Sequence, residues 1–168
     1  MIHVCSFARL NQTIEATGAR HVVTLLGVED QVPLPSQIAR GNYLRLHVHD
    51  IVETTPGQIP PDAEHVERLI AFVRGWKRET PMVIHCWAGI SRSTAAAFTT
   101  VCALNPARDE NEIAAALRKA SATAQPNARI IRLADRLLGR NGRMVEAVQA
   151  ISPSVPAIEA EPFRLDLA

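Results

Sequence analysis

The sequence predicts an α/β fold in which a largely parallel central sheet carries helices on both faces. Short apolar runs rich in Val, Ile and Leu alternate along the chain with longer segments of helical periodicity. Such runs are typical of strands that are buried on both faces of a parallel sheet. One run leads directly into a Gly-containing loop and then into a helix, an order typical of α/β proteins.

The first part of the chain alternates between the two types of element. The predicted elements are strand 2–5, helix 8–17, strand 21–26, loop 27–42, strand 43–48, helix 62–78 and strand 82–85. Gly18 is a typical helix stop. The strand at 21–26 is rich in β-branched residues. The strand at 43–48 places Leu44, Leu46 and Val48 on one side. Apolar residues recur at helical spacing over 62–78 and predict an amphipathic helix.

The second part of the chain is predicted to be helical. The predicted helices are 91–104, 109–120, 128–138 and 142–151. The first of them is rich in Ala, as burial against close neighbours requires. Pro106 separates it from the next helix because proline interrupts helical hydrogen bonding. Gly139 ends the third helix.

The length of 168 residues fits one domain that buries a sizeable core. We expect residues 1–151 to form that domain and residues 152–168, which carry three prolines, to form an extended tail. Phe163, Leu165 and Leu167 alternate with other residues, as in an extended segment that lies on a surface. The sequence leaves open whether that surface belongs to the same domain or to a neighbour, and it leaves the oligomeric state open.

The composition disfavours several classes of partner. The formal net charge is only +1, from 18 basic and 17 acidic residues, so no strong field attracts nucleic acid or anionic lipid. The chain shows no leader pattern and no apolar run of membrane-spanning length. The three cysteines show no disulfide framework or zinc motif. We therefore expect a cytoplasmic protein with no nucleic-acid or membrane partner.

The loop between the strand at 82–85 and the helix at 91–104 is the strongest functional signal. A loop that enters a helix N-terminus aims several backbone N–H groups into one concavity, which binds a tetrahedral oxyanion. Cys86 lies at the floor of this loop, and Arg92, whose planar fork grips two phosphate oxygens, lies at its far end. The sequence therefore predicts a phosphate-binding loop with a built-in nucleophile. The substrate-binding residues that we expect are Trp87, Ala88, Gly89, Ile90, Ser91 and Arg92.

The neighbours of the cysteine fit a nucleophilic role. The thiolate is the reactive form of cysteine and is favoured by helix N-termini and cations. We expect the Ser93 hydroxyl to donate to the Cys86 sulfur, Gly89 to permit the sharp turn, and His85 to orient the loop through its ring N–H. For Trp87 we favour packing beneath the loop over a place on the pocket rim, because most tryptophans are largely buried. The alternative is a buried core thiol beside a helix-capping arginine, which leaves the joint pattern unexplained.

These residues form one run, which reads His85-Cys86-Trp87-Ala88-Gly89-Ile90-Ser91-Arg92-Ser93. The run resembles the signature loop of the cysteine-dependent protein tyrosine phosphatases, and the small size resembles their compact dual-specificity branch. The resemblance is strong over residues 43–104. It implies a two-step reaction through a phosphocysteine, without a metal or other cofactor. The Ala- and Arg-rich composition favours a bacterial member.

Cleavage of an alkyl phosphate ester also requires a proton donor. The resemblance implies an aspartate on a loop upstream of the cysteine, and Asp50 is the best match. It follows the strand at 43–48, and ligands of parallel sheets bind beyond the carboxyl ends of the strands. Glu53 on the same loop is an alternative. Asp62 is another, although it better suits the first turn of the next helix.

Two other patterns have simpler interpretations. His47 and His49 share a strand face, but a metal site needs at least three converging ligands and no second cluster is visible. The segment Gln125-Pro126-Asn127 loosely resembles a stretch that supports the signature loop in dual-specificity phosphatases. We prefer a Pro-containing turn with an Asn cap, since such turns are common.

The predicted function is hydrolysis of phosphomonoesters on phosphorylated protein, with phosphotyrosine preferred, or on a small phosphoester. A phosphatase for inositol phosphates or phosphoinositides is the first alternative, but such substrates favour lysines within the loop, and none is present. A non-enzymatic phosphate-binding scaffold is the second. It is disfavoured because Cys86, Arg92 and a suitable acid are all present.

Overall fold

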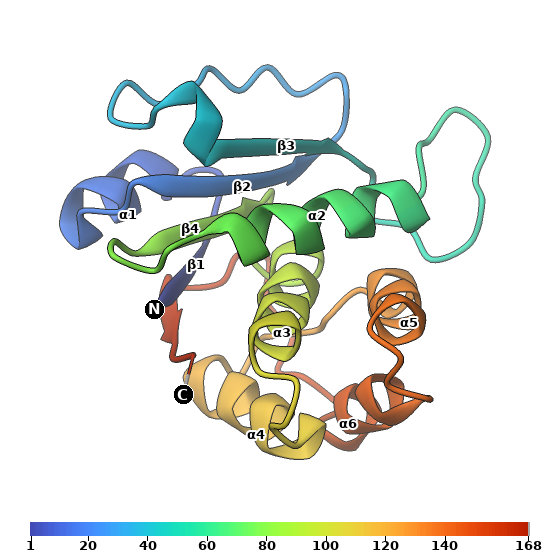
Figure 1. The fold of residues 1–168 in the computed structure, drawn as a ribbon. Helices are drawn as coiled ribbons and strands as arrows, with labels where there is room; N and C mark the ends of the chain where they lie inside the picture. The colour runs from blue at the N-terminus through green and yellow to red at the C-terminus, as the bar shows by residue number, and fades with distance from the viewer. Residues whose placement is uncertain (168) are drawn as a thin grey trace.

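A five-stranded sheet with helices on both faces forms the core of the protein in the computed structural model, which describes residues 1–167 (Figure 1). Along the chain the elements are β1 (Ile2–Ser6), α1 (Leu10–Thr17), β2 (His21–Leu26), the 3-10 helix η1 (Arg40–Asn42), β3 (Tyr43–His47), α2 (Ala63–Gly75), β4 (Met82–Cys86), α3 (Arg92–Leu104), α4 (Glu110–Ala120), α5 (Ala128–Leu137), α6 (Arg143–Ala150) and β5 (Phe163–Leu165). The strand order is β3-β2-β4-β1-β5. The predicted α/β class is confirmed.

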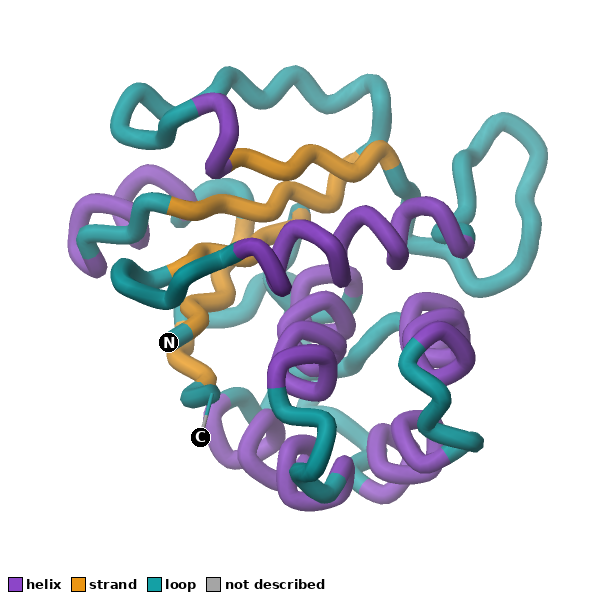
Figure 2. Tube along the Cα trace, in the orientation of Figure 1, coloured by secondary structure: helices purple, strands orange, loops and turns teal. Residues whose placement is uncertain are grey.

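The first four strands are parallel, and β5 is antiparallel to β1. The central strand β4 pairs with β1 through a register that places Ser6 opposite Cys86, and with β2 through one that places Thr24 opposite His85. Because the strands are parallel, their carboxyl ends meet at one edge of the sheet, where ligands bind in such folds. The long connections at 27–39 and 48–62 leave from this edge (Figure 2).

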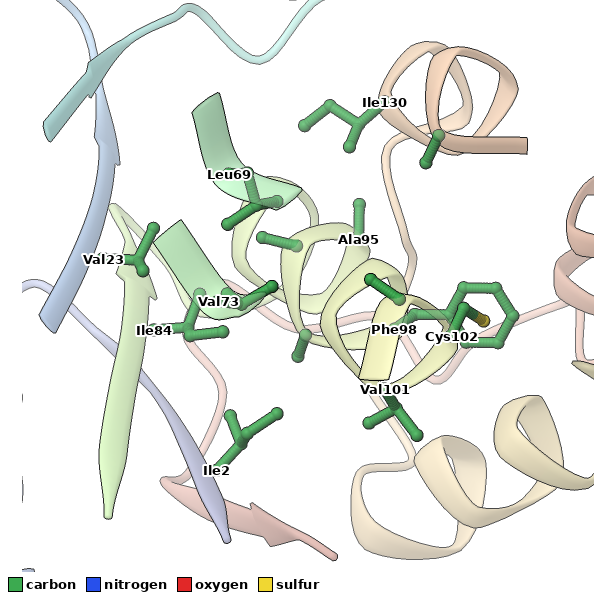
Figure 3. Packing of buried hydrophobic residues seen from close by; sticks show 14 of the residues in the cluster. Ile2, Val23, Leu69, Val73, Ile84, Ala95, Phe98, Val101, Cys102 and Ile130 are labelled. Atoms are coloured by element: carbon green, nitrogen blue, oxygen red, sulfur yellow. The ribbon is translucent and has the colours of Figure 1, made fainter. Parts of the chain in front are cut away.

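The two faces of the sheet are covered unequally. Helix α1 covers one face, where its apolar residues pack against Val22 and Val83. Helices α2 and α3 pack on the opposite face, where Ile84 of β4 lies in one cluster with Val73 of α2 and Phe98 of α3 (Figure 3). Helices α4, α5 and α6 lie on the same side and pack against α2, α3 and one another. Helix α3 is buried from its first residue through Ala103, which explains its many alanines. Among residues 1–167, no helix has the length and apolarity needed to cross a bilayer.

Two predicted helix boundaries were wrong because local contacts shorten the helices. The helix expected at 8–17 begins at Leu10, since the chain first makes a turn in which the Leu10 N–H donates to the carbonyl of Phe7 at 3.2 Å. The helix expected at 62–78 ends at Gly75. Trp76 is buried there and its ring N–H donates to the carbonyl of Thr80 at 3.0 Å, which turns the chain inward.

The described part of the tail, residues 152–167, packs on its own domain. Phe163 and Leu165 are buried and lie opposite Val4 and Ile2 of β1, so that β5 becomes the edge strand of the sheet. The proposed boundary at 151/152 therefore separates helical from extended chain but not two independent units.

Candidate active site

Cys86 lies at the floor of a cavity of about 540 Å³ at the carboxyl edge of the sheet. It is the last residue of β4 and only 1% of its surface is exposed. The Ser93 hydroxyl lies 3.1 Å from the Cys86 sulfur, within hydrogen-bond distance, from the first turn of α3. The structure thus brings together the predicted nucleophile and the predicted hydroxyl.

The loop between Cys86 and α3 turns its carbonyl groups away from the cavity. Four backbone N–H groups from other segments hold these carbonyls: Phe7 to Trp87 at 3.1 Å, Ala160 to Ala88 at 2.9 Å, Gln125 to Ile90 at 2.9 Å and Asn127 to Ser91 at 3.2 Å. Over the described chain, the N–H groups of residues 87–91 have no acceptor of their own. Consecutive free N–H groups before a helix form a concavity for an anion.

Gly89 makes this loop shape possible for two reasons. Its φ of 75° lies in the left-handed region that favours glycine. A Cβ at this position would also lie 2.9 Å from the carbonyl carbon of Cys5 and the nitrogen of Ser6. The end of β1 therefore lies directly beneath the loop and fixes how closely the loop approaches the sheet.

Arg92 places a charged and incompletely bonded group beside the cavity. The residue is only 7% exposed, and its Nη1 donates to the carbonyl of Val48 at 2.9 Å. Within residues 1–167 its Nε has no hydrogen-bond partner and lies 3.9 Å from Oδ2 of Asp50. A buried donor without an acceptor is costly, so this arrangement suits a bound anion that accepts from the guanidinium.

Asp50, rather than the two alternative acids, borders the cavity. Its Oδ1 accepts hydrogen bonds from the Ser91 hydroxyl at 2.7 Å and from the Asn127 side-chain amide at 2.9 Å. Glu53 and Asp62 do not line the cavity. Asp62 is instead the N-cap of α2 and accepts from the N–H of His65 at 3.0 Å.

The matching family model agrees with this geometry. The model described as protein-tyrosine phosphatase matches residues 40–124, just over half of the chain. The chain belongs to the protein-tyrosine phosphatase family. It is a cysteine-dependent phosphatase and thus a hydrolase. A search of curated proteins finds no match.

Several solved phosphatases share the fold of this phosphatase. DUSP15 superposes with a TM-score of 0.59 and 20% identity over 89% of either chain. Human DUSP28 gives a TM-score of 0.61 and 19% identity over 90% of this chain and 95% of that one. PTP-2 of Cydia pomonella gives 0.63 and 19% over 80% and 84%, respectively. At these identities the likeness shows the fold alone.

The prediction that Trp87 packs beneath the signature loop was wrong. The phosphatase leaves 59% of this residue exposed on the rim of the cavity, with its ring 5.8 Å from that of Phe7. The space beneath the loop is filled by the backbone of Cys5 and Ser6, as the contacts at Gly89 show. The large ring is therefore left at the surface.

The ring of His85 contacts Thr24 and Phe7, and its role in orienting the signature loop stays a prediction. Its Nε2 lies 2.7 Å from the hydroxyl of Thr24 on β2, and its ring stacks on Phe7 at 5.9 Å. Burial lowers the pKa of His85 to about 4, so the ring is neutral at ordinary pH. The residue thus braces the sheet on the face opposite Cys86.

The segment 125–127 combines both interpretations that the sequence offers. The Asn127 side chain caps α5 by accepting from the N–H groups of Arg129 and Ile130, both at 3.1 Å. The same side chain donates to Asp50, and two backbone N–H groups of the segment hold the signature loop. The preferred interpretation as an Asn-capped turn is correct but incomplete.

The C-terminal tail reaches the cavity, a contact that sequence reasoning missed. Ala157 and Ile158 of the tail line the cavity, and no local pattern in the sequence indicates that contact.

His49 of the histidine pair lies 3.1 Å from Glu29 and accepts from the N–H of Ile59 at 2.8 Å. Across residues 1–167, no group of three or more potential ligands is close enough to hold a metal ion.

Proposed function

We propose that this phosphatase hydrolyses phosphomonoesters through a phosphocysteine on Cys86, with phosphotyrosine as its preferred substrate. The observation that carries the proposal is the set of groups that share a cavity with the Cys86 thiol. Cys86, Arg92 and most of the loop residues between them line one cavity, and within residues 1–167 the loop N–H groups have no acceptor and the Nε of Arg92 has no hydrogen-bond partner. Such an arrangement binds the oxygens of a phosphoryl group next to a nucleophile.

In the first step, the Cys86 thiolate attacks phosphorus in line with the ester oxygen. A sulfur–phosphorus bond forms while the bond to the leaving oxygen breaks, and Asp50 gives its proton to that oxygen. Arg92 and the loop N–H groups stabilise the charge on the three equatorial oxygens. Positioning and electrostatic stabilisation of this kind account for most of phosphoryl-transfer catalysis.

In the second step, water attacks the phosphorus of the phosphocysteine. Asp50, now ionised, takes a proton from this water, and the sulfur–phosphorus bond breaks. The hydroxyl of Ser93, 3.1 Å from the sulfur, donates to the departing thiolate. Inorganic phosphate is released and the starting protonation states are restored.

The charges around the cavity favour substrates with one phosphate. Of the described residues that line it, Arg92 alone carries a cationic side chain. Inositol phosphates and phosphoinositides carry several phosphates and need more cations than this. A phosphorylated protein or a small phosphoester is therefore the partner that we propose, with neither nucleic acid nor membrane. A cytoplasmic location and a bacterial source, expected from composition, belong to the same proposal.

Hydrolysis of para-nitrophenyl phosphate in the presence of EDTA tests the proposal. We expect turnover that survives EDTA, disappears in Cys86→Ser and persists in Cys102→Ala, in which a buried cysteine of α3 is removed. The Cys86→Ser variant should still bind inorganic phosphate. Phosphate binding without turnover in the wild-type protein would instead support the scaffold, and turnover lost with EDTA would contradict the metal-free mechanism.

A further inference from the structure

The C-terminal tail crosses the mouth of the cavity as a strap that is fixed at both ends. Before the crossing, the N–H of Val155 donates to the carbonyl of Ala122 at 2.9 Å. After it, the N–H of Ala160 donates to the carbonyl of Ala88 in the signature loop, also at 2.9 Å. Between these bonds, Ala157 and Ile158 line the cavity. Fixed ends hold these two residues in one place relative to Cys86.

Side-chain contacts strengthen both ends of the strap. The carboxylate of Glu159 accepts from the buried hydroxyl of Ser6 at 2.5 Å, next to the floor of the loop. The hydroxyl of Ser154 lies 3.4 Å from the side-chain oxygen of Gln125. The strap is thus tied to β1 and to the turn before α5, the same two segments that hold the signature loop.

The strap presents a large apolar side chain to solvent. Ile158 is 96% exposed, although the strap is fixed on both sides of it. Trp87 of the signature loop borders the same cavity and is 59% exposed. The cavity therefore has a polar, anion-binding floor and apolar side chains at its mouth. A ligand that matches both carries a phosphate at one end and a flat apolar body at the other.

We propose that Ile158, together with Trp87, forms an apolar wall that holds the aromatic ring of an aryl phosphate and thereby selects aryl over alkyl phosphates. The proposal rests on the proposed function for the phosphate at the floor. A phosphotyrosine is long enough to leave its ring at the mouth of the cavity, where the ring and Ile158 shield each other from water. A phosphoserine is shorter and leaves Ile158 exposed. Ile158 is then a specificity-determining residue supplied by the tail.

Binding to the inactive Cys86→Ser protein tests the wall without requiring turnover. Calorimetry compares phosphotyrosine, phosphoserine and inorganic phosphate in this background with and without Ile158→Ala. Loss of the apolar contact should weaken phosphotyrosine by about fivefold to tenfold. Inorganic phosphate and phosphoserine should bind as before, because neither reaches Ile158. Since Ile158 is almost fully exposed, the substitution leaves the fold intact.

Val155→Ala is the matched control, since Val155 is an exposed apolar residue of the same tail that does not line the cavity. It should change none of the three affinities. Unchanged phosphotyrosine affinity in Ile158→Ala would overturn the proposal. So would an equal loss for all three ligands, which would mean that the tail acts on the loop through Ala160. Wild-type protein that binds these ligands but hydrolyses no phosphoester would instead contradict the proposed function. It would not contradict the proposed contact between Ile158 and the aromatic ring.

Discussion

Asn127 and Asp50, separated by 77 residues in sequence, are joined by a hydrogen bond of 2.9 Å from the side-chain amide to the carboxylate. The oxygen of the same amide caps α5. Because an amide group is rigid and planar, the start of α5 fixes the direction from which Asp50 is approached. The proposed proton donor is thus oriented by a helix that follows the signature loop, although Asp50 itself lies before that loop.

Asp50→Asn should slow the cleavage of alkyl phosphates far more than that of para-nitrophenyl phosphate. The alkoxide leaving group needs a proton, and a positioned acid contributes about 10²–10⁴-fold. The nitrophenolate leaves without one. Steady-state rates on both substrates measure the difference, with Glu53→Gln as the control. Equal losses on the two substrates would remove Asp50 from this role.

Asn127→Asp should lower kcat for alkyl phosphates by about tenfold, because a second carboxylate replaces the donor that holds Asp50. Aspartate is as good an N-cap as asparagine, so the free energy of unfolding should change little. Asn127→Ala should lose both contacts and cost about 1 kcal/mol of stability in addition. Thermal unfolding and kcat are measured on the same samples. A kcat that follows stability alone would make Asn127 only a helix cap.

Gly89→Ala should abolish phosphate binding and reduce turnover by at least about 100-fold, since small misplacements of reacting groups are this costly. The new Cβ would lie 2.9 Å from backbone atoms of β1 and force the loop toward the cavity. Gly57→Ala is the matched control: Gly57 has a φ of 77°, but beyond its own atoms and its two chain neighbours no heavy atom of residues 1–167 lies within 4 Å of the point that a Cβ would occupy there. It should cost about 1–2 kcal/mol of stability and no activity. Similar activities for the two variants would contradict the close approach.

His85 should make the protein less stable in acid. Burial lowers the pKa of His85 from 6.5 to about 4, so the unfolded chain binds its proton more readily than the folded one. The resulting stability is complete above about pH 6.5 and is lost as the pH falls toward 4. At about 1.4 kcal/mol for each pKa unit, the loss approaches about 3 kcal/mol.

Urea unfolding at pH 7 and pH 4.5 measures this loss. In His85→Gln, which keeps a polar partner for Thr24 but does not titrate, the difference between the two pH values should shrink. The remaining difference comes from other groups such as His3 and His21, whose pKa values burial also lowers. A pH dependence identical to that of the wild-type protein would show that His85 does not titrate in this range.

The strand, loop and helix around Cys86 were predictable because their signals are local. The apolar run ending at Ile84, the turn at Gly89 and the Ala-rich segment after Arg92 each act within a few residues of the sequence. The position of Asp50 beside the cavity was predictable for a related reason, while its role as proton donor stays a prediction. Parallel strands bring their carboxyl ends to one edge, so a residue just beyond β3 lies near one just beyond β4.

The features that sequence reasoning missed depend on contacts between distant segments. Trp87 is exposed because β1 fills the space beneath the loop, and β1 lies some 80 residues earlier in the chain. Strand β5 has three residues, and its antiparallel pairing with β1 carries no periodic signal of its own. Asn127 satisfies the local rule for a helix cap, and that rule does not reveal the second bond to Asp50.

The four N–H groups that hold the signature loop come from Phe7, Gln125, Asn127 and Ala160. During synthesis Cys86 and Arg92 therefore emerge from the ribosome well before the loop has its last partner. A nascent chain that ends shortly after α3 carries both reactive groups but no means of holding the anion site in shape. We expect activity to appear only once the N–H of Ala160 has bonded to the carbonyl of Ala88. A partly synthesised chain should therefore not hydrolyse the phosphoproteins around it.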